Sequence, residues 1–180
     1  TAATVFAQDR YALVVQNDRY ADLALPAVGP AVEELTDHLE QAAFAVTHIR
    51  NGAKREVLGA LQEIESELAH GDTLFVYFAG AGFQHEGVNY VLPANAPIRN
   101  ESDIGFESIA VDRLSAIGDF TEVGEVLVFL EAAYPHPIAD RFASVESGFS
   151  LNTSSVRTLV VTSASPGQLQ AAESTQFTSS

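Results

Sequence analysis

The chain has 180 residues, and a hydrophobic content of 47% with only 18% charged residues is typical of one folded domain and excludes a disordered chain. It carries 24 Asp and Glu against 9 Lys and Arg, and a net charge of −15 argues against nucleic acid or an anionic membrane as a partner. It contains no Cys, which excludes disulfides, thiolate metal ligands and a cysteine nucleophile.

The first nine residues are predicted to be an N-terminal extension, with the folded domain over residues 10–180. Val5-Phe6-Ala7 has the small-x-small pattern of a signal-peptide cleavage site, although an arbitrary chain boundary explains the same residues. The compartment is therefore left open between a secreted or periplasmic and a cytoplasmic location. No apolar stretch reaches the roughly 18 residues that a bilayer-spanning helix needs.

The first half of the chain alternates apolar runs with amphipathic stretches. Residues 11–15 predict a buried strand, because they are continuously apolar and partly β-branched. Residues 31–44 predict a helix with Pro30 in its first turn. A second strand over residues 45–49 and a second helix over residues 54–69 follow.

A third strand is predicted over residues 73–78, and a small hairpin over residues 83–92 turns at His85-Glu86-Gly87. Residues 94–108 are polar and are predicted to be irregular. A short helix is expected over residues 111–120.

A fourth strand is predicted over residues 125–130 and a fifth over residues 158–161. Between them, residues 134–155 are predicted to form a loop, and residues 174–180 an exposed terminus. Alternating strands and helices indicate an α/β fold with helices on both faces of a mostly parallel sheet. Ligands of such sheets bind beyond the carboxyl ends of the strands, which here are residues 79–85 and 131–137.

Five stretches occur in the order of one family pattern. They are RYALVVQN (residues 10–17, with Tyr20 after it), VYFAGAGFQ (76–84), GVNYVLP (87–93), LVFLEAAY (127–134) and TLVVTSASPGQ (158–168), and residues 177–178 add FT. Together they resemble a caspase-type domain, in particular the bacterial metacaspase-like branch of the clan CD cysteine peptidases (peptidase C14). The resemblance implies a three-layer α/β/α sandwich with sheet order 2-1-3-4-5 and a hairpin after the third strand. It also implies that the later helices and last strand of the family are missing from this chain.

In the resembled family, a His after the third strand assists a Cys after the fourth, and the Cys thiolate attacks a peptide carbonyl. The matching positions in this chain are Ala81 and Ala133. A methyl group neither transfers a proton nor attacks a carbonyl, so the resemblance implies that no catalytic residue is intact. The backbone N–H of Gly82 is the position of an oxyanion donor, with nothing left to assist.

The resemblance also assigns substrate-binding positions. Glu131 matches an acidic residue that receives the Arg or Lys side chain of the substrate, and Ser163, Ala164 and Ser165 match a stretch that lies along an extended peptide. A second acid at the start of the first helix is lost at Pro30-Ala31-Val32. The Arg that often follows the Cys is replaced by Tyr134.

Three functions remain open at this point. The first is a natural pseudoprotease that binds a protein or a basic peptide without cutting it. The second is an engineered inactive form of a peptidase that cleaves after Arg or Lys. The third is a structural domain whose cleft is closed by the loop over residues 134–155. The joint departure of His, Cys, acid and Arg favours the first, whereas Ala at both catalytic positions is what an engineered form would carry.

The residues near the lost dyad give little support for a new catalytic pair or for a metal site. His85 and His136 follow the positions of Ala81 and Ala133, but no Ser or Thr nucleophile lies within several residues of Ala133. His85, Glu86 and His136 have no recognised metal-ligand spacing. Asp103 and Glu107, in the segment where the resembled family binds calcium, belong to no acidic run. We therefore expect no metal and no cofactor, and the sequence does not indicate an oligomeric state.

Overall fold

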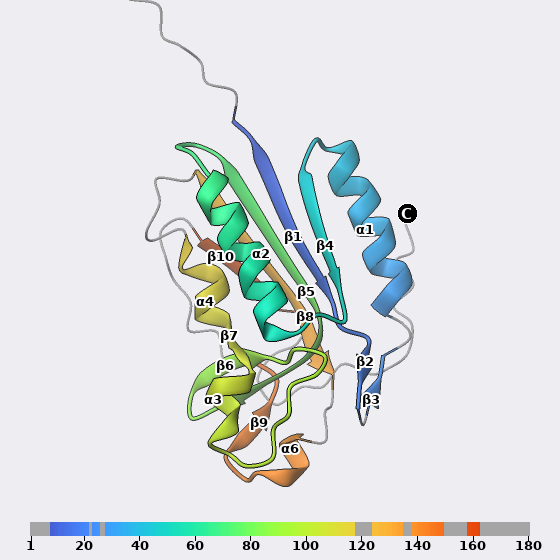
Figure 1. Cartoon of the computed structure of the whole chain (residues 1–180), viewed down its shortest axis with the longest axis vertical. Helices are drawn as coiled ribbons and strands as arrows, with labels where there is room; N and C mark the ends of the chain where they lie inside the picture. Colours follow the sequence, from blue (N-terminus) through green and yellow to red (C-terminus); the bar gives the residue numbers. More distant parts are fainter. Residues whose placement is uncertain are drawn as a thin grey trace, which may run out of the picture.

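The structure is a computed structural model and describes residues 8–21, 23–25, 28–117, 124–134, 138–149 and 158–162. Within these residues, parallel strands form the main sheet in the order β10-β8-β5-β1-β4 (Figure 1). Their bounds are β1 Arg10–Gln16, β4 Ala45–Arg50, β5 Thr73–His85, β8 Glu125–Tyr134 and β10 Thr158–Thr162. Counted along the chain this order is 2-1-3-4-5, so the expected topology is confirmed.

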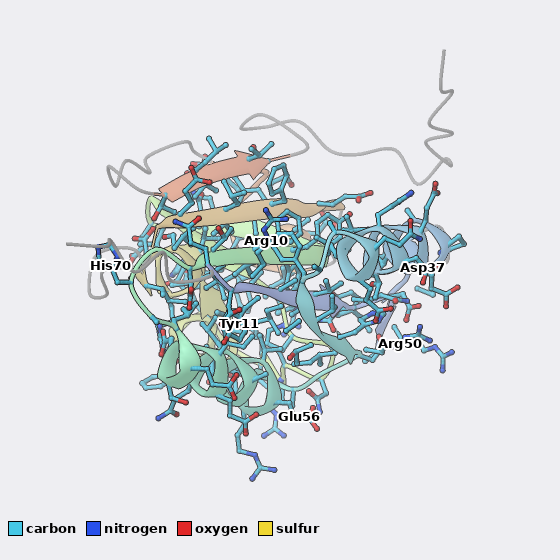
Figure 2. The ribbon with its side chains drawn as sticks, turned by 90° about the horizontal axis from the view of Figure 1, so that it is seen from above. Arg10, Tyr11, Asp37, Arg50, Glu56 and His70 are labelled. Atoms are coloured by element: carbon cyan, nitrogen blue, oxygen red, sulfur yellow. The ribbon has the colours of Figure 1, made fainter. Side chains whose placement is uncertain are left out.

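Helices cover both faces of the sheet. Helix α1 (Val28–Gln41) lies on one face, and α2 (Lys54–Glu67) and α4 (Val111–Ser115) lie on the other. Alternate residues of β1 point to opposite faces, so that Val14 packs in the cluster beneath α1 and Leu13 in the cluster beneath α2. Figure 2 shows the same helices and strands from above. The three-layer sandwich is thereby confirmed.

The acidic residues of the two long helices were predicted to be solvated. The carboxylates on α1 and most of those on α2 are exposed, including the labelled Asp37 and Glu56 (Figure 2). Glu65 on α2 is half-buried instead, because it forms a bidentate ion pair with Arg113 at 2.7 and 3.1 Å.

A smaller sheet extends the carboxyl end of β5. Strand β6 (Val88–Val91) pairs antiparallel with β5 and forms the expected hairpin, while β7 (Ile109–Ala110) pairs with β6 and β9 (Val145–Ser147) pairs with β5. A third apolar cluster, which includes Phe83, Leu92 and Ile138, packs against this region. The extension lies at the edge of the main sheet where a ligand site is expected (Figure 1).

Two predicted strands were too short. The third strand does not stop at residue 78, because β5 continues to His85 and exchanges its partner β8 for β6 and β9 on the way. The fourth strand likewise continues to Tyr134 instead of residue 130. A small ribbon of β2 (Arg19–Tyr20) and β3 (Leu23–Ala24) was not predicted.

Helical segments also differ from the prediction. The first helix ends at Gln41 instead of residue 44, because Ala43 takes a φ of 62° and the Phe44 N–H bonds the Leu39 carbonyl at 3.0 Å. The second ends at Glu67, two residues early. The irregular segment 94–108 contains α3 (Asp103–Glu107), and the loop 134–155 contains α6 (Ile138–Arg141) and β9. Short helices carry too few residues to display a periodic pattern.

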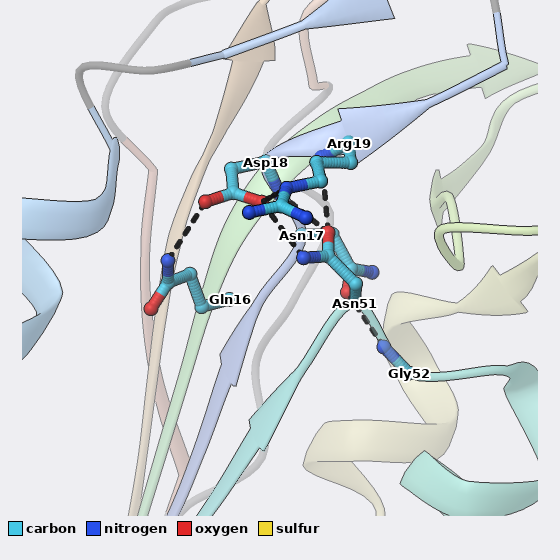
Figure 3. A network of polar contacts seen from close by, with 6 residues as sticks. All are labelled: Gln16, Asn17, Asp18, Arg19, Asn51 and Gly52. Atoms are coloured by element: carbon cyan, nitrogen blue, oxygen red, sulfur yellow. Dashed lines mark hydrogen bonds and ion pairs between the residues drawn. The ribbon is translucent and has the colours of Figure 1, made fainter.

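A polar network joins the carboxyl ends of β1 and β4 to each other (Figure 3), and Asn17 extends it to the hairpin. Asn17 is fully buried; its Nδ2 donates to the Leu92 carbonyl at 3.2 Å, and its Oδ1 accepts from the Gly52 N–H at 3.2 Å. Asn51 Oδ1 accepts from the backbone N–H groups of Asp18 and Arg19 at 3.1 and 2.9 Å. The ends of β1 and β4 are therefore fixed relative to each other and to the hairpin.

Replacing Asn17→Ala removes both side-chain bonds and leaves the buried N–H of Gly52 without its acceptor. We expect the free energy of unfolding to fall by about 1–3 kcal/mol, measured from the urea midpoint. The exposed Asn100→Ala is the matched control and is expected to change stability by less than about 0.5 kcal/mol. Equal effects of the two substitutions would contradict this role of Asn17.

Candidate functional site

The two alanines at the expected catalytic positions lie on neighbouring parallel strands. Ala81 on β5 is in register with Ala133 and Tyr134 on β8, and the pairing shifts by one residue at Ala81. Beyond this irregularity, β5 pairs with β6 over Gly82 to His85 instead of with β8. The structure thus brings the two positions together, and neither residue type supplies an acid, a base or a nucleophile.

Ala81 is completely buried. Its N–H donates to the Tyr20 hydroxyl at 2.8 Å, and its carbonyl accepts from the Leu92 N–H at 2.9 Å. Its side chain belongs to the cluster that contains Phe83, Leu92 and Ile138, with Tyr20 packed against it. The space around the methyl group is therefore occupied by protein.

Tyr20 fills the position beside the third strand. Its hydroxyl accepts from Ala81 and donates to the Leu92 carbonyl at 3.2 Å. Burial is the main cause that raises the pKa of Tyr20, so the phenol stays protonated and remains a donor at neutral pH. Tyr20 is consequently a structural group of this site and offers no nucleophile.

Two glycines allow this close packing. A Cβ on Gly80 would collide with the Tyr20 hydroxyl and lie 3.1 Å from both the Cβ and the carbonyl oxygen of Asn17. A Cβ on Gly82 would collide with the ring of Phe149 and lie 2.9 Å from the Ala132 carbonyl oxygen. Gly82 sits opposite Val91 in the β5–β6 pair, so its first role here is to permit close approach of the chains.

Glu131 lies on β8 beside Ala79 of β5. Its Oε2 accepts a short hydrogen bond from the Tyr77 hydroxyl, which fixes the orientation of the half-buried carboxylate. A carboxylate accepts up to about four hydrogen bonds, so the bond from Tyr77 does not by itself prevent a second donor from binding. The expected role of Glu131 in receiving a basic side chain stays a prediction.

Several other predicted residues lie outside the described part of the chain, namely Ser163, Ala164, Ser165 and His136. His85 ends β5, and its Nδ1 is buried without a hydrogen-bond partner among the described residues. The Asp103 carboxylate accepts from the N–H groups of Arg99 and Asn100 at 2.9 and 3.1 Å, and these bonds lower the pKa of Asp103.

Two further features of the described residues concern metal binding and membrane spanning. No group of three or more His, Asp or Glu side chains among them is placed to hold a metal ion. None of the helices in that part of the chain is long and apolar enough to cross a membrane.

A cavity of about 360 Å³ lies at the carboxyl edge of the sheet, and Ala81 itself is not among the residues that line it. Tyr20 and Leu92, which both bond Ala81, line it together with the loop over residues 93–99 and with Ile138 and Arg141. The sequence did not identify Arg99 and Arg141 as neighbours, because 41 intervening residues separate them (141 − 99 − 1). The only sequence feature that could have drawn attention to these arginines is that the chain has few basic residues, 9 against 24 acidic ones.

Restoring a histidine at the first dyad position tests how full the site is. Ala81→His inserts an imidazole where the methyl is already buried, so we expect the free energy of unfolding to fall by about 1–3 kcal/mol. The urea midpoint measures the loss. Ala45→His, at an exposed position on strand β4, is the control and should cost less than about 0.5 kcal/mol. If Ala81→His cost no more than the control, the space beside Ala81 would be open.

Comparison with known proteins identifies the family of this chain and supports its fold. The family model of the caspase domain (peptidase C14) matches residues 9–179. Over 94 residues the chain is 32% identical to mucosa-associated lymphoid tissue lymphoma translocation protein 1 of Homo sapiens, a match that covers 51% of this chain and 11% of that protein. The fold resembles a crystal structure of a protein from Geobacter sulfurreducens, with a TM-score of 0.55 and 18% identity over 75% of this chain and 54% of that one. The chain belongs to the caspase-domain family, and because it contains no cysteine it lacks the catalytic cysteine of that family.

Proposed function

We propose that this chain is a non-catalytic caspase-family domain, a pseudoprotease, that binds a protein or peptide partner. The observation that carries the proposal is the state of the dyad positions. Ala81 and Ala133 face each other in the strand register, and Ala81 is buried against Tyr20. A peptide carbonyl at this place would meet no nucleophile and no proton donor.

Binding is favoured over a purely structural role by what surrounds the lost dyad. A domain with a fully closed cleft would leave no space at the carboxyl edge of the sheet, yet a cavity of about 360 Å³ is lined there by Tyr20 and Leu92, the two residues that bond the Ala81 backbone. Glu131 supplies a carboxylate next to the position of Ala133. The buried Ala81 favours the structural alternative, which therefore remains the second candidate.

Restoring both dyad residues separates a lost activity from a blocked one. We expect Ala81→His with Ala133→Cys to remain inactive on peptides ending in Arg, Lys or Asp, because the imidazole cannot be placed without displacing Tyr20. Release of a fluorogenic leaving group measures cleavage, and Ala133→Cys alone controls for thiol reactivity. Cleavage by the folded double variant alone would instead identify an inactivated peptidase whose substrate site is complete.

A basic peptide tests the binding half of the proposal. The probe acetyl-Leu-Arg-Leu-amide is expected to bind, and Glu131→Gln to weaken it about five- to tenfold, on the order of 1 kcal/mol. Glu125→Gln removes the same charge from an exposed position on the same strand and should leave the Kd within about twofold. Calorimetric titration gives both Kd values. If the two variants behave alike, Glu131 is not the receiving group.

A further inference from the structure

The cavity lined by Tyr20 and Leu92 differs in charge from the chain as a whole. The chain has 24 acidic residues against 9 basic ones, yet the described residues that line this cavity include two arginines, Arg99 and Arg141, and no Asp or Glu. The other lining groups that contribute side chains are chiefly apolar, such as Leu92, Ile98 and Ile138. A concave, mostly apolar site with a few convergent polar groups is the usual form of a ligand site.

Arg141 is held in place before any ligand arrives. Its guanidinium donates to the carbonyls of Ile98 and Arg99 at 3.0 and 3.1 Å and lies 5.2 Å from the centre of the Phe142 ring. These bonds also fix the loop that carries Arg99. A guanidinium has more N–H groups than these two bonds use, so Arg141 retains donors for a ligand. Such preorganisation lowers the entropy lost on binding.

Neither arginine is neutralised by a direct ion pair within the described residues. No carboxylate oxygen there lies within 4.0 Å of either guanidinium. Asp103 is the acidic neighbour of Arg99. Its carboxylate oxygen accepts from the backbone N–H groups of Arg99 and Asn100, which chiefly lower the pKa of Asp103, and the Arg99 charge lowers this pKa further without forming an ion pair within 4.0 Å. Asp140 precedes Arg141 and is exposed.

We propose that this cavity binds an acidic residue of a peptide partner, with Arg99 and Arg141 holding its carboxylate and the apolar lining holding its neighbours. The proposal rests on the binding role proposed above and names a second element of the partner. A guanidinium is the side chain best suited to hold a planar carboxylate. The net charge of −15 opposes polyanions at long range, which favours one carboxylate over a nucleotide or a multiply charged phosphate ligand. The volume of about 360 Å³ is at the lower end of the range of ligand pockets, as expected for a short segment.

The test uses acetyl-Leu-Glu-Leu-amide and its neutral twin acetyl-Leu-Gln-Leu-amide. Backbone amide chemical shifts of Ala94, Asn95, Ala96, Ile98 and Arg99 follow the titration by NMR. We expect the Glu peptide to move these signals and to bind about tenfold more tightly than the Gln peptide. Arg99→Gln is expected to abolish that tenfold preference. Arg141→Lys keeps the charge, loses the paired bonds to the loop and should weaken the Glu peptide severalfold.

Arg55→Gln is the matched control, because it changes the net charge by the same amount as Arg99→Gln. Arg55 lines a second cavity, which shares Pro93, Asn95 and Ala96 with the first. It should leave the Kd of the Glu peptide within about twofold. Equal binding of the Glu and Gln peptides, or equal effects of Arg99→Gln and Arg55→Gln, would overturn the proposal. Unfolding midpoints of all variants show whether a lost signal reflects a lost fold.

Two further arms separate the sources of an effect. If isovalerate alone binds as tightly as the Glu peptide, the cavity takes a free small carboxylate and the peptide assignment is wrong. If the Arg peptide binds in a manner sensitive to Glu131→Gln while the Glu peptide does not bind, the binding function stands and this inference fails. If neither peptide binds, both fail.

Discussion

The carbonyl oxygen of Leu92 is the shared hydrogen-bond acceptor that holds the carboxyl edge of the sheet together. Asn17 and Tyr20, which both follow strand β1, donate to this oxygen at 3.2 Å, and the Tyr20 hydroxyl in turn accepts from the Ala81 N–H. The shared acceptor ties the first strand to the hairpin and to the end of β5. Because Asn17 and Ala81 are fully buried, water cannot replace these bonds when one is lost. The walls of the cavity and the position of Ala81 follow from this arrangement.

Loss of the dyad and retention of the fold are compatible for a physical reason. The register of β5 and β8 is set by buried apolar side chains along both strands, such as Val76 and Val128, and not by the two residues at their ends. Alanine at Ala81 and Ala133 therefore removes chemistry without removing a contact that the sheet requires. The glycines at 80 and 82 still serve the close packing of Tyr20 and Phe149. In the proposed function, this scaffold would hold a partner chain without cutting it.

The charges of the molecule are divided between two kinds of surface. Carboxylates cover the outer faces of α1 and α2, whereas the cavity at the carboxyl edge is lined by Arg99 and Arg141 without an acid. Glu131, whose orientation Tyr77 fixes, lies on β8 two residues before Ala133. A partner with one basic and one acidic residue on an apolar segment would complement both sites. The acidic exterior would repel a uniformly acidic partner at low salt.

The sequence by itself determined the layers and the absence of a cysteine nucleophile, because continuous apolar strands and helical periodicity are local patterns and residue types can be counted. The strand order and the dyad positions came from the resemblance to caspase-type domains, since no local pattern encodes which strands pair. The sequence did not show α3, α6 or the small strands, which are too short to carry a period, nor that β5 runs unbroken through Ala81 to His85. Only the tertiary structure decided that Ala81 is buried under Tyr20 and that Arg99 meets Arg141 at one cavity. Burial and convergence arise from contacts between residues far apart along the chain, and no local pattern encodes them.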